Sequence, residues 1–317
     1  MNKFFGLLVI LFISCDVKES KSVDVSDINV NVTIDRFEQK FYNCTPENLQ
    51  KLKGTYPFLF PSQTNDSIWI LKSNNVEELE LLKKSEKVFG DFEAKKNQIE
   101  DLFKHIKYYQ PTFKEPKIIT LITNLDYQNK IMYADSLLFV SLDMYLGAKS
   151  EVYQDFPDYL SKNFDEKQLT VDIAQAIGEQ FIFYNRNRQF VELMVSEGVK
   201  LYQTEMYLPN STDNQIIGYT DDEISWISAN EEQLWKYFIE NDLLYSTNPQ
   251  LKSRFIDTAP FSKFYINIDK ESPGRVGVWL GWQIVRSYMK NNNVTLSQLL
   301  ETKEEEIFKK SKYKPKK

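Results

Sequence analysis

The chain has 317 residues, a formal net charge of −6, 42% hydrophobic residues and 14% aromatic residues. A chain of this size can bury a core of its own, and its acidic balance argues against nucleic acid as a partner. Only two cysteines are present. This excludes a disulfide framework and leaves the apolar core to stabilise the fold.

The chain opens with MNKFFGLLVILFISC, in which one lysine precedes an apolar run from Phe4 to Ile13. A membrane-spanning helix needs about 20 residues, so this shorter run predicts a signal peptide over residues 1–14. Cys15 directly after it resembles a bacterial lipobox, in which the signal is cut before the cysteine and the cysteine is acylated. We therefore predict a lipoprotein that starts at Cys15, is anchored to a membrane by its lipid and lies outside the cytoplasm, in either leaflet. A cleaved secretory signal with an incidental cysteine is the alternative.

The next residues predict how the mature chain is organised. Residues 15–27 are polar, lack a periodic apolar pattern and indicate a lipidated tether. A single domain is expected over residues 28–310, with two fused lobes, 28–150 and 151–310, as the alternative. Lysines crowd the last nine positions, and residues 311–317 are expected to form a solvated basic tail.

The periodicity of apolar residues predicts strands first and helices later. Alternation over residues 28–34 predicts a half-buried strand, and residues 76–109 follow a helical period that is expected to break near Gly90. Two β-rich runs follow at 117–123 and 136–142, with residues 129–134 between them as a possible hairpin strand. Further helices are expected at 165–184, 189–207, 221–243, 275–291 and 295–310. A small sheet followed by a mostly helical remainder indicates an α+β fold.

Two short stretches raise the question of chemistry. GEQFI spans Gly178 to Ile182, and SEG with Glu197 follows on the next expected helix. With histidine at positions 178 and 182 the first stretch would read HEQFH, a zinc-peptidase motif with Glu179 as the catalytic base. Zinc sites in enzymes usually take two or three neutral nitrogens, and the chain has one histidine, His105. The sequence therefore predicts no bound metal and no zinc peptidase, and ordinary solvated glutamates are the plainest interpretation of Glu179 and Glu197.

Several runs together resemble the gliding-motility lipoprotein GldB family of gliding bacteria. They are the lipobox-like start, LDMYLG at Leu142 to Gly147 with Asp143, the pair Glu197-Gly198, and the long stretch from Asp257 to Met289. That family is similar to zincin-like proteins, which have a strand near the cleft, a helix that carries HExxH in active members, a following helix with Glu-Gly and a later helix packed nearby. The resemblance implies a zincin-like fold with a degenerate site at Gly178, Glu179, Ile182 and Glu197.

The C-terminal stretch also has a physical interpretation of its own. Gly277 and Gly281 lie four residues apart on an expected helix, a spacing that permits close approach of another backbone. A buried packing helix is the plainer interpretation, and a ligand-contacting helix is the alternative. Arg275 and Asp257 are the residues that we expect to be held in a polar network.

The resemblance implies a membrane-anchored scaffold or assembly factor of the gliding machinery and its associated type IX secretion. It also implies other envelope proteins as partners and no catalysis or cofactor. Two alternatives remain. One is a hydrolase of an envelope glycan that uses Glu179 and Glu197 as a carboxylate pair. The other is a module that holds an extended peptide in the degenerate peptidase groove by strand addition.

Overall fold

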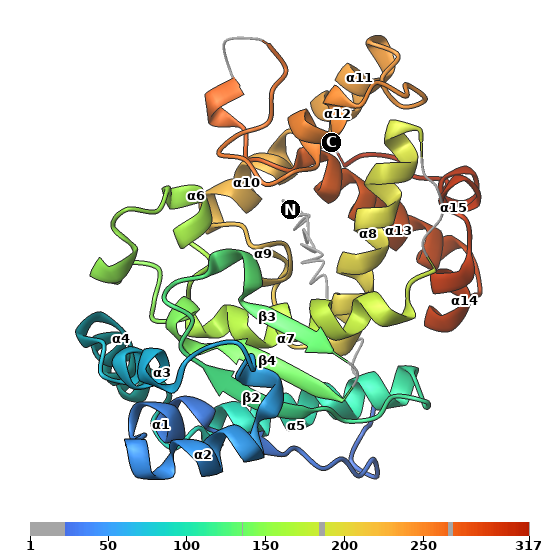
Figure 1. Cartoon of the computed structure of the whole chain (residues 1–317). Helices are drawn as coiled ribbons and strands as arrows, with labels where there is room; N and C mark the ends of the chain where they lie inside the picture. The colour runs from blue at the N-terminus through green and yellow to red at the C-terminus, as the bar shows by residue number, and fades with distance from the viewer. Residues whose placement is uncertain (1–22, 135, 184–187, 266–268, 317) are drawn as a thin grey trace, which may run out of the picture.

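The computed structural model describes residues 23–134, 136–183, 188–265 and 269–316 (Figure 1). The signal peptide and Cys15 lie outside the described residues. The fold is α+β and mostly helical, with one sheet of four strands, so the predicted fold class is confirmed. No helix of the described residues is long and apolar enough to cross a membrane.

The sheet combines three parallel strands with one antiparallel edge strand. Its strands are β1 (Ile34–Asp35), β2 (Lys117–Leu121), β3 (Ile131–Ala134) and β4 (Leu137–Ser141), in the spatial order β1-β2-β4-β3. β1, β2 and β4 are parallel, and β3 pairs with β4 as the antiparallel hairpin expected from sequence. Buried β-branched residues in β2, such as Ile118 and Ile119, explain why the centre of the sheet forms there.

The first expected strand is mostly wrong. Residues 28–34 keep their alternation, with Val32 buried between two exposed neighbours. However, only Ile34 and Asp35 pair with β2. Alternation predicts which side chains are buried, whereas a strand also needs a partner over its whole length.

The N-terminal helices surround the sheet on its β1 side (Figure 1). They are α1 (Phe37–Tyr42), α2 (Pro46–Thr55), the 3-10 helix η1 (Pro57–Leu59), α3 (Asp66–Ser73), α4 (Val76–Phe89) and α5 (Glu93–Tyr109). The break between α4 and α5 falls at Gly90, whose φ of 54° is left-handed, as expected. Ile99, Leu102, Phe103 and Ile106 of α5 are fully buried at helical spacing.

The second half of the chain is helical apart from its loops. Short 3-10 helices lie before or within this half: η2 (Tyr127–Asn129), η3 (Leu142–Met144), η4 (Glu151–Tyr153) and η5 (Glu166–Gln168). The other elements of this half are α6 (Asp158–Ser161), α7 (Leu169–Gly178), η6 (Glu179–Phe181), α8 (Phe190–Tyr207), α9 (Asp213–Ile217), α10 (Asp221–Ala229), α11 (Glu231–Glu240), α12 (Gln250–Phe255), η7 (Asp269–Glu271), α13 (Val276–Asn291), α14 (Leu296–Glu301) and α15 (Glu304–Ser311).

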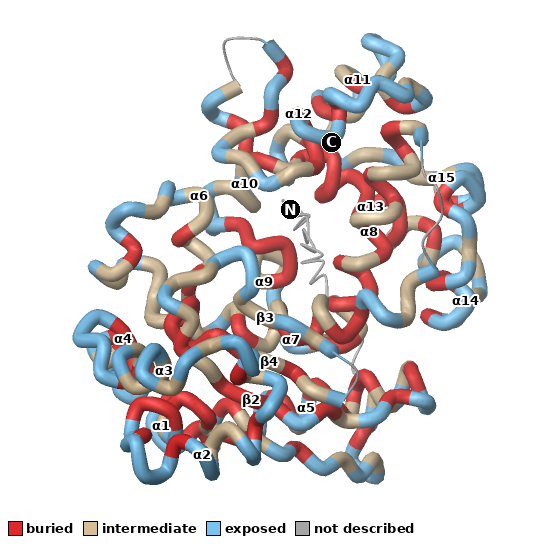
Figure 2. The backbone as a smooth tube through the Cα atoms, in the orientation of Figure 1, coloured by how far each residue is buried: buried red, intermediate tan, exposed pale blue. Residues whose placement is uncertain are grey.

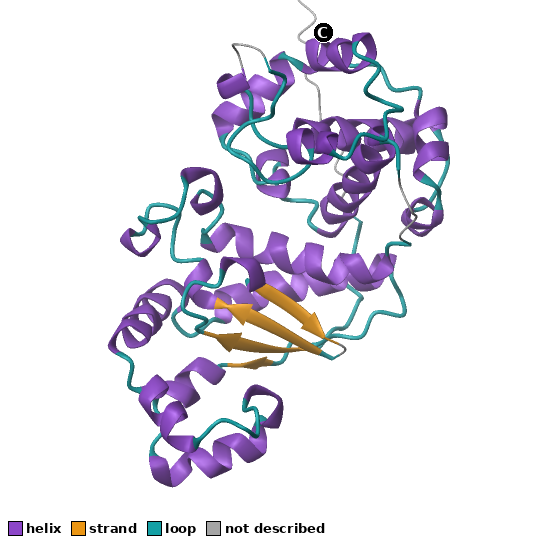
Figure 3. Cartoon of the chain, turned by 45° about the horizontal axis from the view of Figure 1, so that its top comes forward, coloured by secondary structure: helices purple, strands orange, loops and turns teal. Residues whose placement is uncertain are grey.

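Most helices from α8 onward gather away from the sheet, as Figure 3 shows. At their centre α8 packs against α13, and both are largely buried in Figure 2. The helices expected at 221–243 and 295–310 are each divided, by Asn230 and by residues 302–303. Asparagine and threonine beside these breaks serve as caps, because their side chains compete with the helix for backbone hydrogen bonds.

The basic tail is attached to α11, although its lysines at 312, 314 and 316 are exposed to solvent. Tyr313 donates its hydroxyl to Glu231 Oε1 at 2.8 Å, and Lys316 N donates to the same oxygen at 3.0 Å. The Tyr313 ring also meets Trp235 edge-on, with centroids 5.1 Å apart. The aromatic residue inside the lysine run explains the attachment, because it has apolar surface to bury.

Candidate functional site

The stretch GEQFI does not lie within one α-helix. α7 ends at Gly178, residues 179–181 form the 3-10 helix η6, and Ile182 is extended with φ −89° and ψ 126°. Positions 178 and 182 therefore do not share one helical face, and that part of the predicted site is wrong. The chain leaves the helix where aromatic and β-branched residues of low helix propensity accumulate.

Position 178 is closed by the following helix. A Cβ atom built on Gly178 would lie 2.8 Å from Oε1 of Gln203, which is on α8. Gln203 is buried and donates from its Nε2 to the Tyr207 hydroxyl at 2.9 Å. A buried amide thus fills the space that a side chain at position 178 would enter.

Glu179 and Glu197 do come together, through a lysine. Lys200 Nζ lies 2.9 Å from Glu197 Oε1 and 3.8 Å from Glu179 Oε1, so the two oxygens are at most about 7 Å apart, the sum of these distances. The side chain of Glu179 is 57% exposed and that of Glu197 is 29% exposed. Lys200 thus places one positive charge between the two carboxylates. The site is a surface ion cluster in which solvent reaches both carboxylates.

The remaining metal-binding residue types are dispersed. Within the described parts of the chain, no group of three or more His, Cys, Asp or Glu side chains is placed to hold a metal ion. His105 is buried in α5, with Nδ1 2.9 Å from the carbonyl oxygen of Asp101. Cys44 is a buried free thiol.

Asp143, in the run LDMYLG, supports a loop at the carboxyl end of β2. Its buried carboxylate accepts hydrogen bonds from Thr123 N at 3.0 Å and from Leu125 N at 2.7 Å. Asn124 and Leu125 have left-handed φ angles of 58° and 63°. Burial raises the pKa of Asp143, although these N–H donors act in the opposite direction. Its contacts are those of a structural carboxylate.

Glycines make the contact between α8 and α13. A Cβ on Gly281 would lie 1.7 Å from Met194 O, and one on Gly198 would lie 2.3 Å from the carbonyl of Gly281. Gly277 lies against Ile256, Phe255 and Phe190. The Glu197-Gly198 pair of α8 and the two glycines of α13, Gly277 and Gly281, thus lie at the same helix crossing.

A polar cleft lies between the sheet side of the molecule and the C-terminal helices. It has a volume of about 320 Å³, and its lining includes Lys130 next to β3, Asp172 on α7, Ile217 on α9 and Arg275 at the start of α13. Arg275 donates from one guanidinium nitrogen to Ile217 O at 2.9 Å. Asp257 pairs with Lys252 at 2.6 Å on the surface, so the two residues expected to be held in a polar network each have a polar partner, although not the same one.

The cleft contains a charged cluster that the sequence analysis missed. Asp172 Oδ2 lies 2.5 Å from Lys130 Nζ and accepts a hydrogen bond from the Tyr145 hydroxyl at 2.8 Å. Burial raises the pKa of Tyr145 well above its usual value, so the phenol stays protonated and acts as a donor. The available signal was Asp172 itself, the one charged residue in the otherwise apolar helix LTVDIAQAIG.

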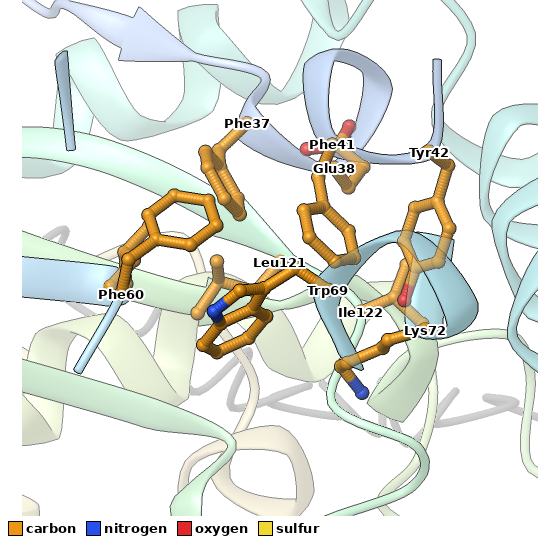
Figure 4. A pocket seen from close by; sticks show the side chains of 10 residues that line it. Phe37, Glu38, Phe41, Tyr42, Phe60, Trp69, Lys72, Leu121 and Ile122 are labelled. Carbon is orange, nitrogen blue, oxygen red and sulfur yellow. The ribbon is translucent and has the colours of Figure 1, made fainter. Parts of the chain in front are cut away.

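A second hollow lies between α1, η1, α3 and β2 (Figure 4). Its volume is about 140 Å³, and aromatic rings, among them Phe37, Phe41, Phe60 and Trp69, form most of its wall. The Trp69 indole nitrogen is buried without a hydrogen-bond partner among the described residues. The indole packs edge-on against Phe60, with centroids 4.9 Å apart. The hollow is mainly apolar, and its two charged lining residues, Glu38 and Lys72, form ion pairs with Arg36 and Glu78.

The comparison with known families decides the broad identity. The model of the gliding motility protein GldB matches residues 18–315. The chain belongs to the GldB family. No curated protein and no solved structure matches the chain. The match runs from the tether through the tail, so the Glu179–Lys200–Glu197 cluster, the helix crossing and the polar cleft all lie within it.

Proposed function

We propose that this GldB-family chain is a lipid-anchored, non-catalytic component of the gliding motility machinery and its associated type IX secretion. The family match over residues 18–315 is the observation that carries this proposal. The family's association with gliding, together with the lipobox-like Cys15, favours a place in the cell envelope with other envelope proteins as partners. Its role there is that of a scaffold or assembly factor.

The absence of catalysis is supported by the end of α7. Gly178 and Ile182 lack ligand atoms, and the amide of Gln203 lies where a side chain at position 178 would project. Lys200 also places one positive charge beside the two neighbouring carboxylates. A glycosidase of the carboxylate-pair type needs one carboxyl kept protonated by its surroundings. In this cluster both carboxylates are exposed to solvent and lie beside an ammonium group, so the hydrolase alternative has little physical support.

A zincin-like fold that has lost its metal is part of the proposal. Three features support it: β3 is an antiparallel edge strand, α7 packs against it, and α8 follows with Glu197-Gly198. The place of α13 against α8 fits the later helix that the resemblance implies. In this view the glutamates remain from a peptidase ancestor while the helix crossing keeps the shape of the protein.

The test is complementation of a strain that lacks this chain. Glu179→Gln and Glu197→Gln should restore gliding and secretion, because each amide keeps the shape of the side chain and can still hydrogen-bond. Gly281→Leu should fail, because a bulky side chain would meet the backbone of α8. Protein abundance is measured in every strain. Normal abundance with complete loss of function for Glu179→Gln would overturn the scaffold and restore the enzyme hypothesis.

Peptide binding is a second candidate, favoured by the place of β3 as the last strand of the sheet. Ser141 N donates to Lys130 O at 2.9 Å, and Ile131 pairs with Val140. In an antiparallel ladder alternate residues point their N–H and C=O groups toward the partner strand. Ile131 and Tyr133 therefore turn theirs away from β4, toward the open edge. Such an edge can accept an extended peptide as a further strand.

Amide hydrogen exchange tests this second candidate directly. In the free protein the amides of Ile131 and Tyr133 should exchange faster than the amide of Met132, which faces β4. Addition of an excess of pooled random pentapeptides should slow exchange at Ile131 and Tyr133 selectively. Unchanged exchange at both amides would exclude strand addition at β3.

A further inference from the structure

Arg275 stands out in the polar cleft because its charge is not balanced locally. Lys130 pairs with Asp172 at 2.5 Å, and Lys162 at the cleft's shallow extension pairs with Glu223 at 2.6 Å. Arg275 donates to a backbone carbonyl, and no carboxylate of the described residues forms an ion pair with it. The cleft therefore keeps one positive charge in a chain whose net charge is −6.

The backbone at Arg275 is held in an unusual conformation. Its φ of 62° and ψ of 29° are left-handed, a region that non-glycine residues rarely adopt. The next residue, Val276, donates its N–H to the buried Ser262 Oγ at 3.3 Å. Gly274, just before it, accepts a hydrogen bond from the Tyr219 hydroxyl at 2.5 Å. These contacts fix where the Arg275 side chain starts, at the lining of the cleft.

The orientation of β3 determines which end of an added peptide would lie near Arg275. β3 begins immediately after Lys130, which lines the cleft together with Arg275, and runs away from the cleft toward Ala134. A peptide added antiparallel to β3 would therefore run toward Lys130 and end with its carboxyl terminus at the cleft. A parallel peptide would place its positively charged amino terminus there. The excess positive charge favours the antiparallel arrangement.

We propose that the cleft binds the C-terminal carboxylate of an extended peptide through the Arg275 guanidinium. A planar guanidinium can donate two hydrogen bonds to a carboxylate, and a partly buried site strengthens them. The cleft volume of about 320 Å³ can hold a terminal residue and its neighbour. This inference rests on the second candidate function, strand addition at β3. It adds that the bound peptide must end in a free carboxylate.

The experiment compares two pools of random pentapeptides, one with free C-terminal carboxylates and one with C-terminal amides. Each pool is passed over the immobilised protein, and retained peptides are quantified by mass spectrometry. Wild type should retain the free-acid pool about tenfold more than the amide pool, the difference expected for one charge-assisted contact. Arg275→Gln should remove this preference, and Arg275→Lys should restore part of it. Arg188→Gln, at an exposed arginine before α8, should leave it unchanged.

The variants are compared only if their thermal unfolding matches that of wild type. Equal retention of the two pools by wild type would overturn the carboxylate site while leaving strand addition at β3 intact. Retention of neither pool would overturn both. If neither pool is retained but acetate or phosphate binds directly in an Arg275-dependent way, measured by calorimetry, the peptide would be overturned as the source of the carboxylate and a site for free small anions would remain.

Discussion

Asp35 shows how one residue's surroundings set its charge state. It ends β1 and is nearly buried, and it lies 2.5 Å from Lys40 Nζ, 2.7 Å from Lys117 Nζ and 2.8 Å from the Tyr56 hydroxyl. Burial by itself raises the pKa of Asp35, but hydrogen bonds from Lys117, Lys40 and Tyr56 outweigh it and hold the pKa below its ordinary value. The ionised carboxylate thus links β1, β2 and α1.

The lowered pKa predicts a loss of stability in acid. An unfolded aspartate titrates near about 3.9, so the stabilisation from Asp35 is fully present above that pH and is lost as pH falls through the lower folded pKa. The free energy of unfolding, measured by urea titration between about pH 6 and pH 2, should therefore fall less steeply in Asp35→Asn than in wild type. Asp155→Asn, at an exposed aspartate, should keep the wild-type slope. An unchanged slope in Asp35→Asn would show that its ion pairs do not favour the charged form.

Two glycines allow two secondary-structure elements, α8 and α13, to pack closely where they cross. The backbones approach so closely that even a methyl group on Gly281 would overlap Met194 O. A shift of either helix would also disturb buried neighbours such as Trp282, which donates from its indole nitrogen to Glu205 at 3.0 Å. The crossing therefore has little freedom to relax.

Gly281→Ala should destabilise the protein by about 1–3 kcal/mol or more, because the added Cβ meets backbone rather than a movable side chain. The matched control is Gly54→Ala in α2, where nothing lies within 4 Å of the new Cβ. Alanine has the higher helix propensity, so this control should be neutral or stabilising by up to about 1 kcal/mol. Urea denaturation measures both changes. Equal stability of the two variants would contradict the close crossing.

Elements with a local signal were predictable from the sequence, and those that depend on distant partners were not. The break at Gly90 and the β3–β4 hairpin follow from glycine and from short β-rich runs. The strand pairing, which is limited to Ile34 and Asp35, depends on what packs beside it. The same holds for the candidate sites: Lys200 lies three residues after Glu197, but its contact with Glu179 required the fold. Arg275 was noted from the sequence. Its cleft could not be predicted, because the residues that line it, such as Lys130 and Arg275, are about 150 positions apart in the chain.

At the scale of the whole molecule, the C-terminal tail closes the helical half. Ser311 O accepts a hydrogen bond from Ser287 Oγ at 2.8 Å, and Tyr313 reaches Glu231 beyond it. Burial, followed by the Glu231 charge, raises the pKa of Tyr313 far above its ordinary value, so the phenol remains a hydrogen-bond donor at any physiological pH. The tail is thus part of the folded body.

Tyr313→Ala should lower the free energy of unfolding by about 2–4 kcal/mol, since it removes an aromatic packing contact and leaves the buried Glu231 short of a donor. Lys314→Ala, one residue further at an exposed position, should change stability by less than about 0.5 kcal/mol. Thermal unfolding followed by circular dichroism compares the two variants. A tail that contributes nothing would give the same Tm for both.

The proposed attachment of the whole molecule to a membrane rests on Cys15, which lies outside the described residues. The apolar run before it is too short to span a bilayer, so stable anchoring requires acylation of the cysteine. Cys15→Ala should abolish incorporation of labelled fatty acid and release the protein from the membrane fraction. The only other cysteine, Cys44, is buried in the folded body. Cys44→Ala should therefore keep the label, and labelled fatty acid that persists in Cys15→Ala would exclude Cys15 as the anchor.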